Sequence, residues 1–237
     1  MLRRLLKSVQ MQNYRNVEVI LTLDESQNNL DKVIAEFEKD VKISSFYDAP
    51  LGISANTNFA VSKARGSIIK VLYQDDFLSD KYVITRIVRK FKRSGKSWLL
   101  SGSNNFYENT GKFSKRIIPK FSHELFEGKN TISSPSVASF RAEKFVPLSV
   151  ELNMMLDIDW YLRMLHNFGP PIVDRRISVT NGVHNYQAQR AFQRGLLLEL
   201  ELMRSMHDEE ITFVHNVLKD CKCVAQENQR YSYKPLV

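Results

Sequence analysis

The first hundred residues alternate between segments with helical spacing and short apolar runs. In residues 2–13, leucine and valine recur every three or four positions, which predicts a helix. Residues 17–23 then form an almost continuous apolar run, as is typical of a parallel strand that is buried on both faces. A chain that repeats this order is predicted to fold as a mainly parallel β-sheet flanked by helices, in the α/β class.

The same reasoning assigns the rest of the chain. Before residue 102 it predicts helices at 28–39, 54–65 and 79–91, and strands at 41–46, 67–73 and 98–101. After an irregular polar stretch it predicts strands at 132–140 and 172–179, and helices at 154–168, 188–206 and 209–219. We therefore expect one α/β domain over residues 1–190 and a C-terminal helical extension over residues 191–237.

The composition is that of an ordinary globular protein. Of the 237 residues, 43% are hydrophobic, and no apolar run approaches the roughly 18–20 residues that cross a bilayer. Two cysteines, Cys221 and Cys223, lie too close together to staple distant parts of the fold. Since the basic start lacks the pattern of a cleavable signal peptide, we expect a cytoplasmic protein. Peripheral contact with the inner face of the membrane stays open.

The chain carries a net charge of +8, and its basic residues gather at 3–7, 81–96 and 112–120. These clusters are either solvated helix faces or surfaces that attract phosphate, whether in a nucleotide sugar, an anionic lipid or a nucleic acid. The third choice is disfavoured because the basic residues are not interleaved with a recognition motif. We therefore expect no nucleic-acid partner.

Two adjacent carboxylates, Asp75 and Asp76, follow the strand predicted at 67–73. Ligands of parallel sheets bind at the carboxyl ends of strands, and paired carboxylates there repel each other unless a cation lies beside them. A divalent ion that also binds a diphosphate is a natural partner, because Mg²⁺ and Mn²⁺ prefer carboxylate and phosphate oxygens. The alternative is a simple turn that leads into the next helix.

Several segments together resemble one family. They are Gly52-Ile-Ser-Ala-Asn-Thr-Asn58, Ala64-Arg65-Gly66, Ile68–Asp76, Leu23-Asp24-Glu25-Ser26 and Leu156-Asp157-Ile-Asp159-Trp-Tyr-Leu-Arg163, preceded by the helix and strand that contain Leu6–Asn16 and Glu18-Val-Ile. In this order they resemble the family 2 glycosyltransferases, over roughly residues 2–190. The resemblance implies a GT-A-like fold and an inverting transfer of sugar from a nucleotide-sugar donor.

The resemblance also implies roles for individual residues. Asp24 would contact the nucleotide base or ribose, and Asp75 would lie near the donor ribose. Asp76 would hold Mn²⁺ or Mg²⁺ on the diphosphate, and Asp157 would be the catalytic base.

Three further residues are candidate substrate contacts on the same ground. His184, in Asn181-Gly-Val-His-Asn185, stands where many members place a histidine near the diphosphate, although a loop histidine is an equal alternative. Asn58 matches the family's helix asparagine, with a helix-surface amide as the alternative. Asp159 belongs to the same acidic motif as Asp157, and it alternatively caps its helix or faces solvent.

The chain also departs from the family pattern. It starts at the helix that follows the family's usual first strand, so we expect an N-terminally truncated domain. Gln74, Leu156 and Glu25 replace more typical residues. Because the absent strand would lie between the strands at 17–23 and 67–73, we predict a gap there, or its filling by another segment.

The expected function is glycosyl transfer in surface polysaccharide synthesis. A UDP-sugar is the expected donor, and a sugar, a lipid-linked glycan or a polysaccharide is the expected acceptor. The alternative is an inactive glycosyltransferase-like module that acts as a binding or scaffold protein.

Overall fold

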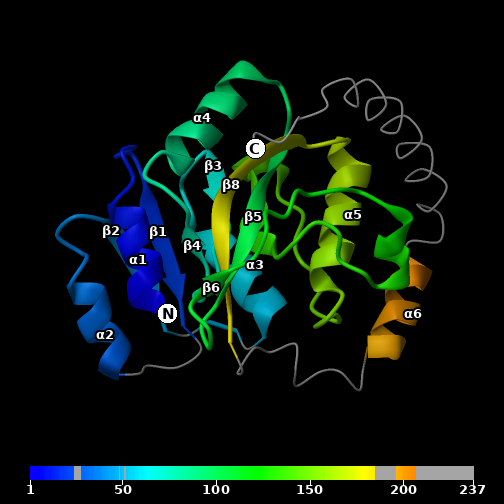
Figure 1. Cartoon of the computed structure of the whole chain (residues 1–237), viewed down its shortest axis with the longest axis horizontal. Helices are drawn as coiled ribbons and strands as arrows, with labels where there is room; N and C mark the ends of the chain where they lie inside the picture. The colour runs from blue at the N-terminus through cyan, green and yellow to red at the C-terminus, as the bar shows by residue number, and fades with distance from the viewer. Residues whose placement is uncertain (24–27, 48, 51, 185–195, 207–237) are drawn as a thin grey trace, which may run out of the picture.

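The computed structural model describes residues 1–23, 28–47, 49–50, 52–184 and 196–206. Figure 1 shows a larger central sheet with a two-stranded sheet and two helices on its left, and with helices α5 and α6 on its right. The α/β fold class predicted from the sequence is confirmed.

The six-stranded main sheet has the order β3-β7-β5-β8-β4, and β6 also pairs with β5. Its strands are β3 (Ile68–Lys70), β4 (Phe77–Leu78), β5 (Trp98–Tyr107), β6 (Lys112–Phe113), β7 (Ala138–Arg141) and β8 (Ile172–Val183). Only β5 and β8 run parallel, and every other pair is antiparallel. This corrects the prediction of a mainly parallel sheet, because β7 enters between β3 and β5 and runs against both.

A separate small sheet contains the first two strands. β1 (Glu18–Thr22) pairs in parallel with β2 (Lys42–Phe46), and within the described part of the chain no further strand joins these two. The prediction that residues 17–23 share one sheet with residues 67–73 and 98–101 is therefore wrong.

Helices form at the predicted places, with bounds that differ from the predictions by at most four residues, and residues 188–195 of the helix predicted at 188–206 lie outside the described residues. They are α1 (Leu2–Gln10), α2 (Asn28–Ala35), α3 (Ile53–Lys63), α4 (Val83–Arg93), α5 (Leu156–Phe168) and α6 (Leu196–Met206), with 3₁₀ turns η1 (His123–Glu127), η2 (Pro135–Val137) and η3 (Ala142–Lys144). The helix predicted at 209–219 lies outside the described residues. In the described residues, no helix combines the length and the hydropathy needed to cross a bilayer.

The largest core cluster joins α5 to one face of the main sheet. Trp160 and Tyr161 of α5 are fully buried, and Trp160 packs edge-on against Phe140 of β7 with ring centroids 5.7 Å apart. The indole Nε1 of Trp160 donates to the Val146 carbonyl at 2.8 Å, so this buried polar atom is satisfied. The first turn of α5 is thereby fixed relative to the sheet.

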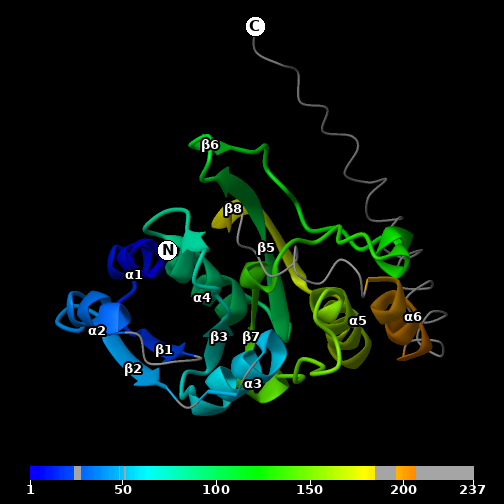
Figure 2. The same cartoon turned by 90° about the horizontal axis from the view of Figure 1, so that it is seen from below.

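Helix α6, which lies in the predicted C-terminal extension, packs on the α/β domain (Figure 2). Met203 is fully buried in the main core cluster. One carboxylate oxygen of Glu199 accepts from the backbone N–H groups of Asn153, Met154 and Met155, just before α5 begins. Glu199 therefore stabilises the approach to α5.

A cavity of about 1980 Å³ separates β1 from β3. Side chains from both strands line it, together with apolar side chains of α1, α3 and α4, among them Leu5, Val61 and Ile87. In the part of the chain that the structure describes, β1 pairs only with β2, and β3 only with β7. The predicted gap is therefore confirmed, and it leaves two backbone edges without a strand partner among the described residues.

Candidate active site

The acidic turn after β3 lies at one end of this cavity. The N–H of Asp76 donates to the carbonyl of Tyr73 at 3.0 Å, which folds the chain back before β4. Asp76 is only 3% exposed, and its two oxygens accept from the backbone N–H of Gly182 at 3.1 Å and from Ser134 Oγ at 3.2 Å. Burial, together with the charge of Asp75, raises the pKa of Asp76 to about 7.

Asp75 lies beside His184, as the sequence predicted for two groups of one site. The Nε2 atom of His184 is 3.4 Å from Asp75 Oδ2, and both residues line the cavity. The backbone carbonyl of Asp75 accepts from Arg4 Nη2 at 2.8 Å, and the same nitrogen contacts Glu108 Oε1 at 3.0 Å. The Arg4 guanidinium thus connects α1 to the acidic turn.

Gly182 lets the acidic turn approach β8. A Cβ atom at position 182 would lie 2.3 Å from the carbonyl oxygen of Asp75 and 2.8 Å from Arg4 Nη2. Side chains cannot come that close to a backbone oxygen, so the turn would have to move.

We predict that Gly182→Ala lowers the affinity for UDP in the presence of Mn²⁺ by at least about tenfold, because small displacements of binding groups are costly. Isothermal titration calorimetry measures this. The matched control is Gly95→Ala, since a Cβ at position 95 meets no atom within 4 Å. Equal affinities for the two variants would contradict this role of Gly182.

Asp157 faces the same cavity from the first turn of α5. Its Oδ2 accepts from Asn130 Nδ2 at 2.6 Å, and its Oδ1 accepts from the N–H of Ile158 at 2.9 Å. Burial raises the pKa of Asp157 to about 6, and the hydrogen bonds from Ile158 and Asn130 oppose that rise. At neutral pH this carboxylate is mostly ionised and able to accept a proton.

Residues 130–136 connect the two acidic positions. Asn130 contacts Asp157, whereas Ser134 contacts both Asp76 and Asn181 Oδ1, the latter at 3.0 Å. Between them, Ser133 has a φ of 129°, which is strained for a residue with a side chain. Its Oγ atom lies 3.0 Å from Ser103 Oγ and 3.0 Å from Asn181 Nδ2.

Sequence reasoning missed this connecting segment. A usable signal was Asn130 followed by Ser133-Ser134-Pro135, since asparagine and serine favour turns through their side chains, and proline ends regular pairing. The amide of Asn130 does form such a turn, because its Oδ1 accepts from the N–H groups of Ile132 and Ser133.

Two predicted substrate contacts lie away from the cavity wall. The amide of Asn58 makes paired hydrogen bonds with the backbone of Leu148, at 2.9 and 2.7 Å. Asp159 is fully buried and contacts Arg163 at 2.5 Å, and Arg163 Nη1 donates to the Pro147 carbonyl at 2.6 Å. Both residues brace the segment before α5, and their assignment as substrate contacts stays a prediction.

The asparagine of α3 that does line the cavity is Asn56. Its Oδ1 accepts from Thr22 Oγ1 of β1 at 2.6 Å. Residues two apart on a helix point about 200° away from each other, so Asn56 and Asn58 face opposite sides of α3. Asp24, the remaining predicted contact, lies outside the described residues.

The acidic turn suits a divalent ion that takes most of its ligands from substrate phosphates and water and few from the protein. In the described residues, no group of three or more His, Cys, Asp or Glu side chains has the arrangement of a protein-only metal site. Mg²⁺ is, however, commonly held by one or two carboxylates together with substrate phosphates and water. The pKa of Asp76 is raised because burial disfavours its ionised form, and a bound cation would stabilise that ionised form.

Solved structures with a similar fold include complexes with nucleotides and nucleotide sugars. S. aureus TarS in complex with UDP superposes with a TM-score of 0.63 at 14% identity, over 92% of this chain and 65% of that one. The mannosyltransferase PcManGT from Pyrobaculum calidifontis, in complex with GDP-Man and Mn²⁺, gives a TM-score of 0.60 at 10% identity, over 99% and 72%. At these identities the likeness establishes the fold, a GT-A fold.

Sequence comparison agrees with the fold. The glycosyltransferase GlyA of Streptococcus pneumoniae is 26% identical over 118 residues, which are 49% of this chain and 17% of GlyA. The chain also spans only 41% of the longer TarS chain. The family model of glycosyl transferase family 2 matches residues 1–153. Since that match covers more than half of the sequence, this chain belongs to glycosyl transferase family 2.

Proposed function

We propose that this chain transfers a sugar from a nucleoside diphosphate sugar to an acceptor hydroxyl, with inversion at the anomeric carbon. The observation that carries the proposal is the placement of Asp75 and Asp76 in one cavity with Asp157, joined by the segment 130–136. A paired acidic turn suits a metal–diphosphate, and a separate buried carboxylate suits a base.

The donor diphosphate belongs at the acidic turn in this proposal. Asp76 would hold Mn²⁺ or Mg²⁺ there, with Asp75 and His184 beside it, and the ion would neutralise charge on the departing diphosphate. Asp24 would contact the base or ribose. The neighbours bound to UDP and to GDP-Man with Mn²⁺ support a nucleotide-sugar donor and a divalent ion, and a UDP-sugar is our proposed donor.

Asp157 acts on the acceptor. Its carboxylate takes the proton of the acceptor hydroxyl while the oxygen lone pair forms a bond to the anomeric carbon. The bond from that carbon to the diphosphate oxygen breaks in the same step, and its electron pair leaves with the nucleoside diphosphate. A single displacement of this kind inverts the anomeric centre. Asn130 keeps the carboxylate oriented through its 2.6 Å hydrogen bond.

The wider role follows from the family and is likewise a proposal. We infer that the acceptor is a sugar, a lipid-linked glycan or a polysaccharide of the cell surface, and that the chain works in the cytoplasm or at the inner membrane face. An inactive nucleotide-binding module is the second candidate. The open cavity between β1 and β3 favours it, because a site without firm walls orients a donor poorly.

A donor panel tests the proposal. We expect one or two nucleoside diphosphate sugars to raise the melting temperature in the presence of Mn²⁺, because ligands that bind only the native state stabilise it. Differential scanning fluorimetry measures the shift, with EDTA and the matching free sugars as controls. If no nucleotide sugar changes the melting temperature, the donor site is wrong.

A further inference from the structure

An extended basic segment runs along the outer edge of β5. Lys112, Lys115 and Arg116, here called the basic strip, are all exposed. Among the residues that the structure describes, none of the three takes part in an ion pair. Over the four residue-to-residue steps from Lys112 to Arg116, an extended chain spans about 13 Å.

Backbone hydrogen bonds hold the basic strip in place. The N–H of Ser114 donates to the Asn105 carbonyl at 2.8 Å, and Ser114 Oγ accepts from the N–H of Asn105 at 2.9 Å. Ile117 exchanges two backbone hydrogen bonds with Ser103, at 2.7 and 3.0 Å. The three cations are therefore attached to a fixed edge of the main sheet.

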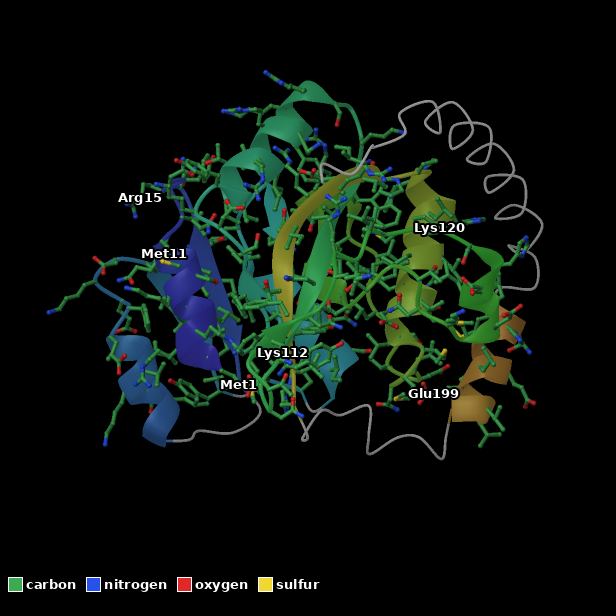
Figure 3. All side chains as sticks on the ribbon, in the orientation of Figure 1. Met1, Met11, Arg15, Lys112, Lys120 and Glu199 are labelled. Carbon is green, nitrogen blue, oxygen red and sulfur yellow. The ribbon has the colours of Figure 1, made fainter. Side chains whose placement is uncertain are left out.

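Ile117, directly after the strip, lines the same cavity as Asp157. Strand β8, which leads to His184, pairs with one edge of β5, whereas β6, Ile117 and β7 pair with the other. The segment 130–136 contacts both β5 and β8, because Ser133 Oγ lies 3.0 Å from Ser103 Oγ and accepts from Asn181 Nδ2 at 3.0 Å. In Figure 3, Lys112 lies at the hairpin of β5 and β6, and Lys120 lies near α5.

Aromatic side chains accompany the cations. Phe113 is 58% exposed and packs its other face on Phe106, with ring centroids 5.0 Å apart. Tyr107, opposite Lys112 in the hairpin, lines the cavity together with Ile117. Flat apolar faces of this kind can pack against sugar rings, while the cations bind negative groups.

We propose that the basic strip binds a polyanionic acceptor chain, a glycan that carries phosphate or carboxylate groups. Lys112, Lys115 and Arg116 bind successive negative groups, and Phe113 and Tyr107 contact the sugar rings between them. The chain then continues towards Asp157, where one hydroxyl reacts. This inference rests on the proposed function, since it names the substrate class of the same site.

The test compares two triple variants with the same loss of charge. One is Lys112→Gln/Lys115→Gln/Arg116→Gln. The control is Lys92→Gln/Arg93→Gln/Lys96→Gln, three exposed residues at the end of α4 and just after it. The probes are inorganic polyphosphate and alginate, with neutral dextran for comparison, and fluorescence anisotropy gives the dissociation constants over a range of salt.

We expect the strip variant to bind both polyanions at least about tenfold more weakly at 0.1 M salt, with a log–log salt slope smaller by about 2. The control variant should change affinity less than about twofold. Equal weakening in both variants, or tight binding of dextran by the unmodified chain, would overturn the proposal. Binding to vesicles of anionic lipid without binding to soluble polyanion would overturn it in favour of a membrane surface.

The donor thermal shift separates this inference from the proposed function. If no nucleotide sugar changes the melting temperature, the proposed transferase function is wrong, whether or not the chain binds polyanions. A chain that responds to a donor, but whose strip variant binds polyanions normally, would keep the proposed function and lose this inference.

Discussion

Asp157→Asn should lower turnover by about 10²–10⁴-fold and leave donor binding intact. Asparagine keeps the shape of the side chain and removes the base, and its single amide oxygen can still accept from one of the two donors, Asn130 Nδ2 or the N–H of Ile158. Steady-state turnover and the donor thermal shift, measured on the same preparation, check the two halves of this prediction.

The control for this variant is Asp159→Asn. Asp159 is fully buried against Arg163, so its loss should lower the melting temperature, since breaking a buried pair is destabilising. Turnover at low temperature should change little. If the two variants exchange these effects, the base is Asp159, and if neither changes turnover, the assignment of Asp157 as the catalytic base fails.

The pH dependence gives an independent check on Asp157. Because burial raises its pKa to about 6, the ionised base is lost as the pH falls below that value. The turnover of the unmodified chain should therefore rise through about pH 6 and level off above it. The residual turnover of Asp157→Asn should lack this step.

Asp76→Asn should abolish Mn²⁺-dependent donor binding and yet stabilise the metal-free chain at pH 8. The folded-state pKa of Asp76, about 7, lies above its usual value of 3.8. The protonated Asp76 side chain stabilises the fold fully below about pH 4, and this stabilisation is lost as the pH rises through 7. At pH 8 the ionised carboxylate then costs on the order of a few kcal/mol, which the amide avoids.

Thermal melts at pH 5 and pH 8, with and without Mn²⁺ and UDP, measure both effects. Without metal, the gain in melting temperature of the variant over the unmodified chain should be larger at pH 8 than at pH 5. Asp75→Asn is the comparison, and it should weaken donor binding less. Donor binding that EDTA leaves unchanged would remove the metal from the account, and a destabilised Asp76→Asn at pH 8 would contradict the buried-charge argument.

The elements of the first hundred residues were predictable because their signals are local. The apolar run at 17–23 and the helical spacing in 2–13 each depend on neighbouring residues, and both elements form. The acidic turn was predictable for the same reason, since Asp75 and Asp76 come soon after the apolar run at 67–73, of which Ile68–Lys70 forms β3.

The sheet pairing was not predictable, because it depends on segments far apart in sequence. Strand β7 joins β3 to β5 although it follows β5 by about thirty residues, and nothing in Ala138–Arg141 alone gives its direction. The position of Asn130 next to Asp157 likewise depends on how the loop folds back. For α3, the sequence pattern favoured Asn58, whereas the packing of the helix turns Asn56 towards the cavity.

The most direct test of the central claim is the anomeric configuration of the first product formed from the donor that the panel identifies. Proton NMR during the reaction reports it. We predict release of the nucleoside diphosphate with the transferred sugar in the configuration opposite to that of the donor, and appearance of both signals at least about 10²-fold more slowly in Asp157→Asn. Retention of configuration, or transfer by Asp157→Asn at the rate of the unmodified chain, would contradict the account.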